Sequence, residues 1–126
     1  MQDGVNGRHW STLDELAEPR GGIARGMGRA YGDPAQNAGG TVVRLARGPI
    51  VLDPRAGTVH VGAGVSLDEL LRHIVPRGFF VPVSPGTRFV MVGGAIASDI
   101  HGKNQHADGS FGGHVDEMTI LLADGT

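Results

Sequence analysis

The chain has 126 residues and a formal net charge of −2, with 40% hydrophobic and 19% charged residues, a composition that indicates one folded domain and argues against a disordered or nucleic-acid-binding segment. It contains no cysteine, so disulfides, thiolate metal sites and a thiol nucleophile are excluded. Glycine is over-represented at 22 residues and clusters without a period, as turns and sites of close backbone approach require.

The first 21 residues predict little regular structure. Thr12 and Glu15 fit a capping box, but Pro19 and Gly21 stop any helix after one or two turns. Neither a signal-peptide core nor an apolar run of the roughly 20 residues that span a membrane is visible. We therefore expect a poorly defined segment over 1–21, a domain from residue 22 onward, and neither nucleic acid nor a membrane span.

A glycine-rich loop follows a short predicted strand that ends at Ala24. The glycines of this loop are Gly26, Gly28 and Gly32. Their spacing matches neither the dinucleotide fingerprint nor a P-loop, yet such glycines can turn successive N–H groups into a concavity that suits phosphate. Arg25 and Arg29 would add charge-assisted hydrogen bonds. The alternative is a surface turn with incidental arginines.

Short strands and one well-marked helix come next. The strands are predicted over 41–45, 50–53, 58–63 and 79–83. Between the last two, Ser66 and Glu69 form a capping box ahead of a helical apolar pattern. Pro76 ends this helix, which we interpret as scaffolding for the core.

The stretch 92–104 joins paired glycines to a polar cluster. Gly93 and Gly94 lie in a helix predicted to begin near Thr87, after a turn, and to hold residues 90–98; its N-terminus would favour an anion. Each glycine costs roughly 1 kcal/mol there against alanine, so a close contact must compensate. The cluster that follows contains His101, Lys103 and Asn104. The alternative is a small-residue helix followed by a polar turn.

The last part of the chain predicts a loop, a strand and a turn. We expect a loop over 105–114, a buried strand over 115–123 and a hairpin turn at 124–125. Because no second strand follows this turn, we expect a chain cut within a domain.

The histidines and serines form no recognisable hydrolytic or metal site. His101, His106 and His114 match no compact metal motif, and Lys103 between them would repel a cation, so we expect no metal. No G-x-S-x-G elbow is present for a serine hydrolase.

Two parts of the chain resemble flavin-linked oxidases of the vanillyl-alcohol oxidase type. The run Ala-Arg-Gly-Met-Gly-Arg-Ala-Tyr-Gly-Asp at 24–33 is similar to the pyrophosphate loop of that family. The Gly-Gly-Ala-Ile-Ala run followed by His-Gly-Lys-Asn resembles the branch formed by the decaprenylphosphoryl-β-D-ribose 2-oxidases, as do Pro-Gly-Thr-Arg at 85–88 and Gly-Ser-Phe-Gly at 109–112. The resemblance runs from about Gly22 to Thr126.

This resemblance implies an α+β fold, an FAD-binding domain of the PCMH type made of two small α+β subdomains. The first subdomain would cover 22–83, and 84–126 would begin the second, which is incomplete here. Family members have a longer helix before the glycine loop, and they continue far beyond the length of this chain.

The resemblance also implies the residues of the site. The cofactor-binding residues would be Arg25, Gly26, Met27, Gly28, Arg29, Ala30, Tyr31, Gly32, Pro85, Gly86, Thr87, Gly93, Gly94, Ala97, Ser98, His101 and Gly102. His101 and Lys103 would lie on the substrate side as catalytic candidates. Covalent relatives carry a histidine after the second glycine of the loop, where this chain has Arg29, so we predict non-covalent FAD.

The implied activity is oxidation of a sugar CH–OH group by an FAD-dependent oxidoreductase. Its substrate would be a polyprenyl-phosphate sugar used for cell-wall arabinan synthesis, and a reductase partner would complete the epimerisation. We expect the cytoplasm or the periphery of the cell envelope as its location. The alternatives are another FAD-linked sugar or alditol oxidase, a flavin- or nucleotide-binding module without turnover, and a structural α+β domain.

Overall fold

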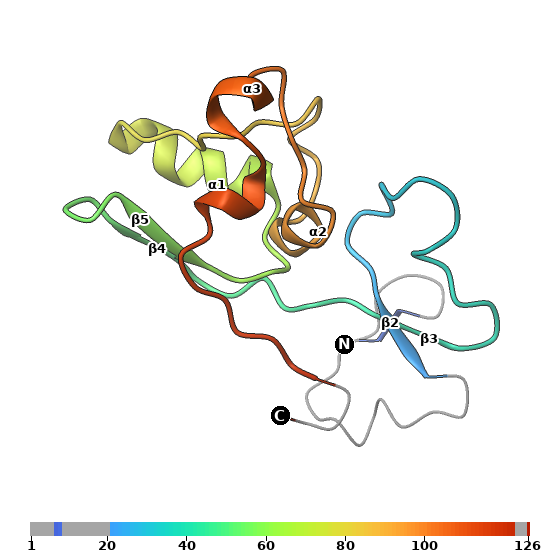
Figure 1. Ribbon diagram of the computed structural model, residues 1–126. Coiled ribbons are helices and arrows are strands. Elements are labelled where there is room, and N and C mark those ends of the chain that lie inside the picture. Colours follow the sequence, from blue (N-terminus) through green and yellow to red (C-terminus); the bar gives the residue numbers. More distant parts are fainter. Residues whose placement is uncertain (1–6, 9–20, 123–125) are drawn as a thin grey trace.

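The computed structural model describes residues 7–8, 21–122 and 126, which form two small sheets and a group of short helices (Figure 1). This is the α+β class predicted from the sequence. The helix signal at Thr12 lies outside the described residues.

The first sheet is parallel. β1 (Gly7–Arg8) and β2 (Gly22–Ala24) flank β3 (Thr41–Val43), and both run parallel to it. All residues of β3 are buried, as expected for a central strand. The side-chain amide of Asn37 donates to the carbonyls of Gly21 and Thr41, each at 3.2 Å, and so closes the loop between β2 and β3.

The second sheet is the antiparallel hairpin of β4 (Ile50–Asp53) and β5 (Thr58–Val61), in which Ile50 lies opposite Val61. Its turn is fixed by the Asp53 carboxylate, which accepts hydrogen bonds from two backbone N–H groups of the turn. Gly57 supplies a φ of +68° that few other residues adopt. One face of the hairpin packs against the core through Ile50, Leu52, Val59 and Val61.

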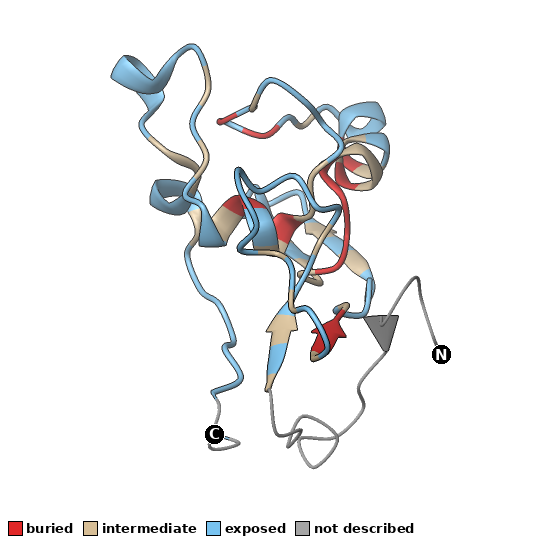
Figure 2. Ribbon diagram, turned by 90° about the vertical axis from the view of Figure 1, so that its right-hand side faces the viewer, coloured by how far each residue is buried: buried red, intermediate tan, exposed pale blue. Residues whose placement is uncertain are grey.

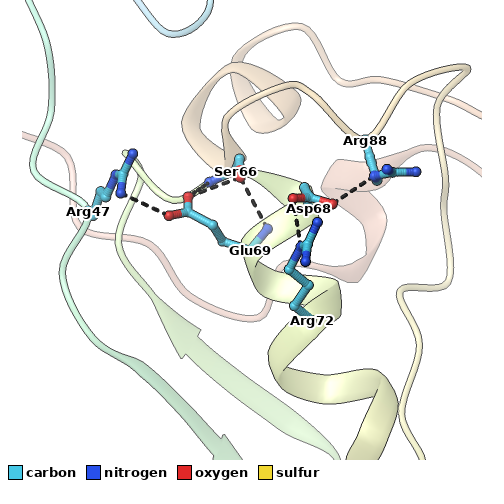
Figure 3. Close-up of polar contacts among 6 residues, drawn as sticks. All are labelled: Arg47, Ser66, Asp68, Glu69, Arg72 and Arg88. Carbon is cyan, nitrogen blue, oxygen red and sulfur yellow. Dashed lines mark hydrogen bonds and ion pairs between the residues drawn. The ribbon is translucent and has the colours of Figure 1, made fainter.

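α1 (Leu67–Ile74) begins at the predicted capping box. The Ser66 hydroxyl accepts from the Glu69 N–H at 3.1 Å, and the Glu69 carboxylate accepts from the Ser66 N–H at 2.9 Å (Figure 3). The helix continues into η2 (Val75–Arg77) and stops at Gly78, whose φ is +86°. Its buried face joins a core made of Val65, Leu67, Leu70, Ile74, Val81 and Val92, part of which Figure 2 shows in red.

The second helix begins later than predicted. α2 spans Val92–Ala97, with Met91 as its N-cap in an extended conformation, and not 87–98. Residues 88–91 lie instead against the start of α1, and Met91 forms an antiparallel bridge with Ser66. The Leu67 N–H donates to the Val90 carbonyl at 2.9 Å, and the Val92 N–H donates to the Val65 carbonyl at 2.8 Å. Backbone pairing with a distant segment therefore overrides the local helical pattern.

Two further predictions on either side of α2 are wrong. Residues 79–83 form no strand, since Pro82 has no N–H to donate to a ladder, and Val81 and Val83 are buried in an irregular segment. The expected loop over 105–114 contains α3 (Gln105–Asp108) and η3 (Phe111–His114).

The buried strand predicted over 115–123 is also absent from the described part of that range. Residues 115–122 are irregular, and Met118, Ile120, Leu121 and Leu122 are all more than half exposed. In the described residues no neighbouring strand pairs with them, so the apolar pattern has no ladder to join. No helix in the described part of the chain is long and apolar enough to cross a membrane.

Ser66→Ala tests the capping box. The substitution removes the acceptor for the Glu69 N–H, and we expect it to lower the free energy of unfolding by about 1 kcal/mol, measured by urea denaturation. Ser98→Ala is the matched control, since Ser98 is exposed at the end of α2 and no side-chain hydrogen bond is found for it in the described residues. Equal stability of the two variants would contradict the capping role.

Acid should weaken the start of α1. The hydrogen bond from Arg72 lowers the pKa of Asp68 from its ordinary 3.8, with Arg88 adding to the effect, and the Ser66 N–H lowers the pKa of Glu69 from its ordinary 4.5. Stability from such groups is complete above the unfolded pKa and is lost as pH falls through the folded one. We therefore expect the free energy of unfolding to fall below about pH 4.5.

The matched variants for this acid effect are Glu69→Gln and Glu117→Gln. Glu69→Gln should flatten the decline in the free energy of unfolding between about pH 5 and pH 3. Glu117, in the exposed 115–122 segment, should leave it unchanged when substituted. Parallel curves for wild type and Glu69→Gln would contradict the assignment.

Candidate functional site

A cavity of about 640 Å³ lies where three parts of the chain meet. The first follows β2, the second follows β3, and the third combines residues 63–64 with Met91 and α2. The lining residues are Ala24, Arg25, Gly26, Arg44, Leu45, Ala46, Arg47, Ala63, Gly64, Met91, Gly93, Gly94 and Ala97. Its size is within the range of ligand pockets, about 300–1,000 Å³.

Parallel pairing explains why the first two parts meet. Because β2 and β3 run in the same direction, their carboxyl ends lie at one edge of the sheet. Arg25 and Arg44 each follow directly after one of these strands. The Arg25 N–H donates to the Val43 carbonyl at 2.8 Å, which ties the start of the glycine loop to the end of β3.

The opposite wall is docked through backbone contacts. The Gly93 N–H donates to the Ala63 carbonyl at 2.9 Å. A Cβ on Gly93 would lie 3.0 Å from the Ala63 Cβ, and one on Gly64 would lie 2.2 Å from the Leu45 carbonyl oxygen. The close packing of α2 and of the 45–47 segment on residues 63–64 therefore explains these two glycines without any ligand.

Gly94 has no such explanation. A Cβ built on it meets no protein atom within 4 Å, and Gly94 is exposed in the cavity wall. Glycine inside a helix costs about 0.5–1 kcal/mol against alanine, and nothing in the described part of the protein compensates for it here. Gly94 leaves space on the cavity side, where an external group can approach the backbone of α2.

The cavity lining is strongly cationic. It contains Arg25, Arg44 and Arg47 and no carboxylate. Arg47 forms an ion pair of 3.2 Å with Glu69, whereas neither Arg25 nor Arg44 has an ion-pair partner among the described residues. The guanidinium of Arg25 lies against Gly28, where an added Cβ would be 2.7 Å from its Nη2 atom. Guanidinium groups without carboxylates suit a phosphate-bearing ligand.

The structure brings together some of the predicted cofactor residues. Arg25 and Gly26 share the cavity with Gly93, Gly94 and Ala97. A Cβ on Gly26 would lie 3.0 Å from the Met91 Cγ, so the glycine loop touches the wall that carries α2. The remaining loop residues, Met27, Gly28, Arg29, Ala30, Tyr31 and Gly32, do not line the cavity, and Tyr31 is fully exposed.

The predicted residues after position 83 form separate features. Pro85, Gly86 and Thr87 line a second hollow of about 290 Å³ together with Ser84, Arg88 and Phe89. Ser98 is exposed at the C-terminal end of α2, and His101 and Lys103 are exposed in the loop that follows. Gly102 packs against Ser84, which lines the second hollow, since an added Cβ would lie 2.6 Å from the Ser84 carbonyl oxygen.

The sequence interpretation missed Arg44, Arg47, Ala63 and Gly64. One signal was available for Arg44: two short apolar strands, 22–24 and 41–43, are each followed at once by an arginine. This signal has meaning only if the strands are parallel neighbours, which no local pattern shows. Residues 63–64 could not be found, because their place in the wall depends on how α2 docks.

Comparison with known proteins gives consistent matches. Residues 15–126 match a family model described as FAD binding domain. The chain is 56% identical over 108 residues to decaprenylphosphoryl-beta-D-ribose oxidase of Mycolicibacterium smegmatis, covering 84% of this chain and 24% of that protein.

More distant relatives also match. An alditol oxidase of Streptomyces sp. is 29% identical over 124 residues, covering 92% of this chain and 30% of the relative. A D-lactate dehydrogenase of Anaerostipes hadrus is 29% identical over 89 residues, covering 69% of this chain and 19% of the relative. The chain thus spans less than a third of the length of each of these relatives.

The two adjacent glycines of α2 should respond in opposite ways to alanine. We expect Gly94→Ala to raise the free energy of unfolding by about 0.5–1 kcal/mol, because it adds helix propensity without a clash. Gly93→Ala should lower it by about 1–3 kcal/mol, because its Cβ is forced against Ala63. Chemical denaturation of both variants measures the difference, and a loss of stability in Gly94→Ala would show that this side of α2 is not open.

Proposed function

This chain belongs to the family of FAD binding domains, and we propose that it is the cofactor-binding part of an FAD-dependent oxidoreductase that oxidises a CH–OH group. The observation that carries the proposal is the shared cavity. It joins the glycine loop after β2 to the open side of Gly94 and contains two arginines without carboxylate partners.

The residues of the cavity fit FAD. The diphosphate of FAD is anionic, and Arg25 and Arg44 offer guanidinium groups at the edge where β2 and β3 end. Gly94 and Ala97 keep the facing side of α2 thin, so a flat group can lie against it. The glycine loop and α2 are therefore proposed to hold the cofactor from two sides.

When bound, FAD supplies the redox chemistry by accepting a hydride from the CH–OH carbon. The residues of this chain bind and orient it. Of the predicted residues, Arg25, Gly26, Gly93, Gly94 and Ala97 are proposed as the cavity contacts. Pro85, Gly86 and Thr87, in the second hollow, are proposed for the adenine side, and His101 and Lys103 for the substrate side.

The proposed substrate class is a polyprenyl-phosphate-linked sugar. Its support is the 56% identity to a protein named decaprenylphosphoryl-beta-D-ribose oxidase. The names of the other two relatives also specify substrates with a CH–OH group, an alditol and D-lactate. A reductase partner, a role in arabinan precursor synthesis, and a location in the cytoplasm or at the periphery of the envelope belong to the same proposal.

The alternative function is an FAD-binding module without turnover of its own. The observation that favours it is that this chain spans less than a third of each relative. Bound flavin that is bleached anaerobically by a decaprenylphosphoryl-ribose analogue supports the oxidoreductase. Bound flavin that never bleaches supports the module.

Arginine substitutions test the cavity as the FAD site. We expect Arg44→Gln to lower the affinity for FAD at least about tenfold, because a charge-assisted hydrogen bond to the diphosphate is lost. The measurement is quenching of flavin fluorescence on titration with the purified chain. Arg55→Gln is the matched control, since Arg55 lies in the turn of the β4–β5 hairpin.

Arg29 provides a second comparison. If the glycine loop holds the diphosphate, Arg29→Gln should also weaken FAD binding. Because Arg44 lines the cavity and Arg29 does not, we expect the larger loss of FAD affinity in Arg44→Gln. Equal FAD affinity of Arg44→Gln and Arg55→Gln would contradict the cavity assignment. Acid precipitation of the loaded chain should release all of the flavin, because we propose non-covalent binding.

A further inference from the structure

The loop that carries His101 and Lys103 is closed at its base by one carboxylate. Oδ1 of Asp99 accepts the N–H of Gly112 at 2.8 Å across thirteen residues. The Ser110 hydroxyl is a second hydrogen-bond partner of this carboxylate. Asp99, the second residue after α2, is thus joined to η3, which lies more than ten residues further along the chain.

The backbone of Asp99 and the missing side chain of Gly112 both favour this contact. Asp99 has a φ of +42°, and it is the only residue other than glycine with a positive φ in the described part of the chain. That region favours glycine, and aspartate and asparagine tolerate it better than other residues. A Cβ on Gly112 would lie 2.9 Å from Oδ1 of Asp99, so the carboxylate reaches this amide because residue 112 is glycine.

Backbone contacts extend the closure to the rest of the loop. The Phe111 N–H donates to the Ile100 carbonyl at 2.8 Å, and the Ile100 N–H donates to the Ala95 carbonyl at 3.1 Å. His101 and Ser110 form an isolated antiparallel bridge. Residues 100–111 are therefore a loop whose two ends are tied to each other and to α2, the helix that carries Gly94.

We propose that Asp99 is a positioning residue that fixes the loop bearing His101 and Lys103 relative to the cavity wall formed by α2. The purpose of this placement rests on the proposed function, in which the two side chains face substrate beside a bound cofactor. The closure itself is a property of the chain without FAD.

Both contacts favour the ionised form of Asp99. The Gly112 N–H is the largest cause of the lowered pKa of Asp99, followed by the Ser110 hydroxyl, with the charge of His101 acting in the same direction. A carboxylate can accept from the amide and the hydroxyl at once. Asparagine keeps one acceptor oxygen and the tolerance of positive φ, which makes it the conservative variant.

Three variants separate the carboxylate from the backbone conformation. Asp99→Gly keeps the positive φ and removes the hydrogen-bond acceptor. Asp99→Asn keeps the tolerance of positive φ and one acceptor oxygen. Gly112→Ala places a methyl group against Oδ1 of Asp99. Amide hydrogen exchange of the chain without FAD is measured at Phe111 and Gly112. We expect exchange at least about tenfold faster in Asp99→Gly and Gly112→Ala, and within about threefold of wild type in Asp99→Asn.

Nitrogen-15 relaxation measures the positioning directly. Backbone order parameters at 101–104 should fall below about 0.6 in Asp99→Gly, recover in Asp99→Asn, and stay unchanged at 93–97 in both. FAD affinity, measured separately, should be the same in all variants, since none of these residues lines the cavity. Failure of wild type to bind FAD would overturn the proposed function while leaving the exchange results intact.

Unchanged exchange and order in Asp99→Gly would overturn the positioning role. It would also be overturned if Asp99→Gly and Gly112→Ala both unfolded the whole chain, because Asp99 would then support the fold and not the loop.

Discussion

The parallel pairing of β2 with β3 is the constraint on which the cavity depends. Because of this pairing, two chain segments leave the sheet at the same edge, and each begins with an arginine. The hydrogen bond from the Arg25 N–H to the Val43 carbonyl holds the two segments together. Arginines brought together in this way repel one another unless an anion lies between them. The cavity lining provides no carboxylate, and the nearby Glu69 forms its ion pair with Arg47 and with neither of the other two arginines among the described residues. The charge distribution therefore favours an anionic ligand, which supports the proposal that the diphosphate of FAD binds here.

The opposite wall depends on how α1 begins. Residues 63–66 have three roles. Their carbonyls accept hydrogen bonds from the start of α2, Ser66 is the N-cap of α1, and residues 63–64 form part of the cavity surface. The same short segment thus supports both the core and the site. A ligand bound between the two walls would stabilise the folded chain in proportion to its affinity, because the unfolded chain has no such cavity. The docking contacts also explain why α2 starts at Val92, where the backbone leaves its pairing with residues 65–68.

The sequence predicted the features that have local causes. The capping box of α1, the strands β4 and β5 and the glycine loop carry their signals within a few residues, and the resemblance to FAD-binding oxidases is confirmed by the family match. It could not distinguish Gly93 from Gly94, because one packs on Ala63 and the other faces open space. It also missed Arg44, because the role of this residue depends on the parallel pairing of β2 with β3. The prediction of a buried strand over 115–122 was wrong, because a strand needs a neighbouring strand, and none pairs with this segment in the described residues.

We propose that the glycine loop and α2 enclose one FAD molecule from two sides. Amide chemical-shift mapping during an FAD titration of the nitrogen-15-labelled chain tests it most directly. We expect the amides at 25–26, at 44–47 and at 93–97 to shift together with one saturation curve, while the amides of the β4–β5 turn keep their positions. Shifts confined to a single one of these segments, or different saturation curves for the two walls, would contradict it.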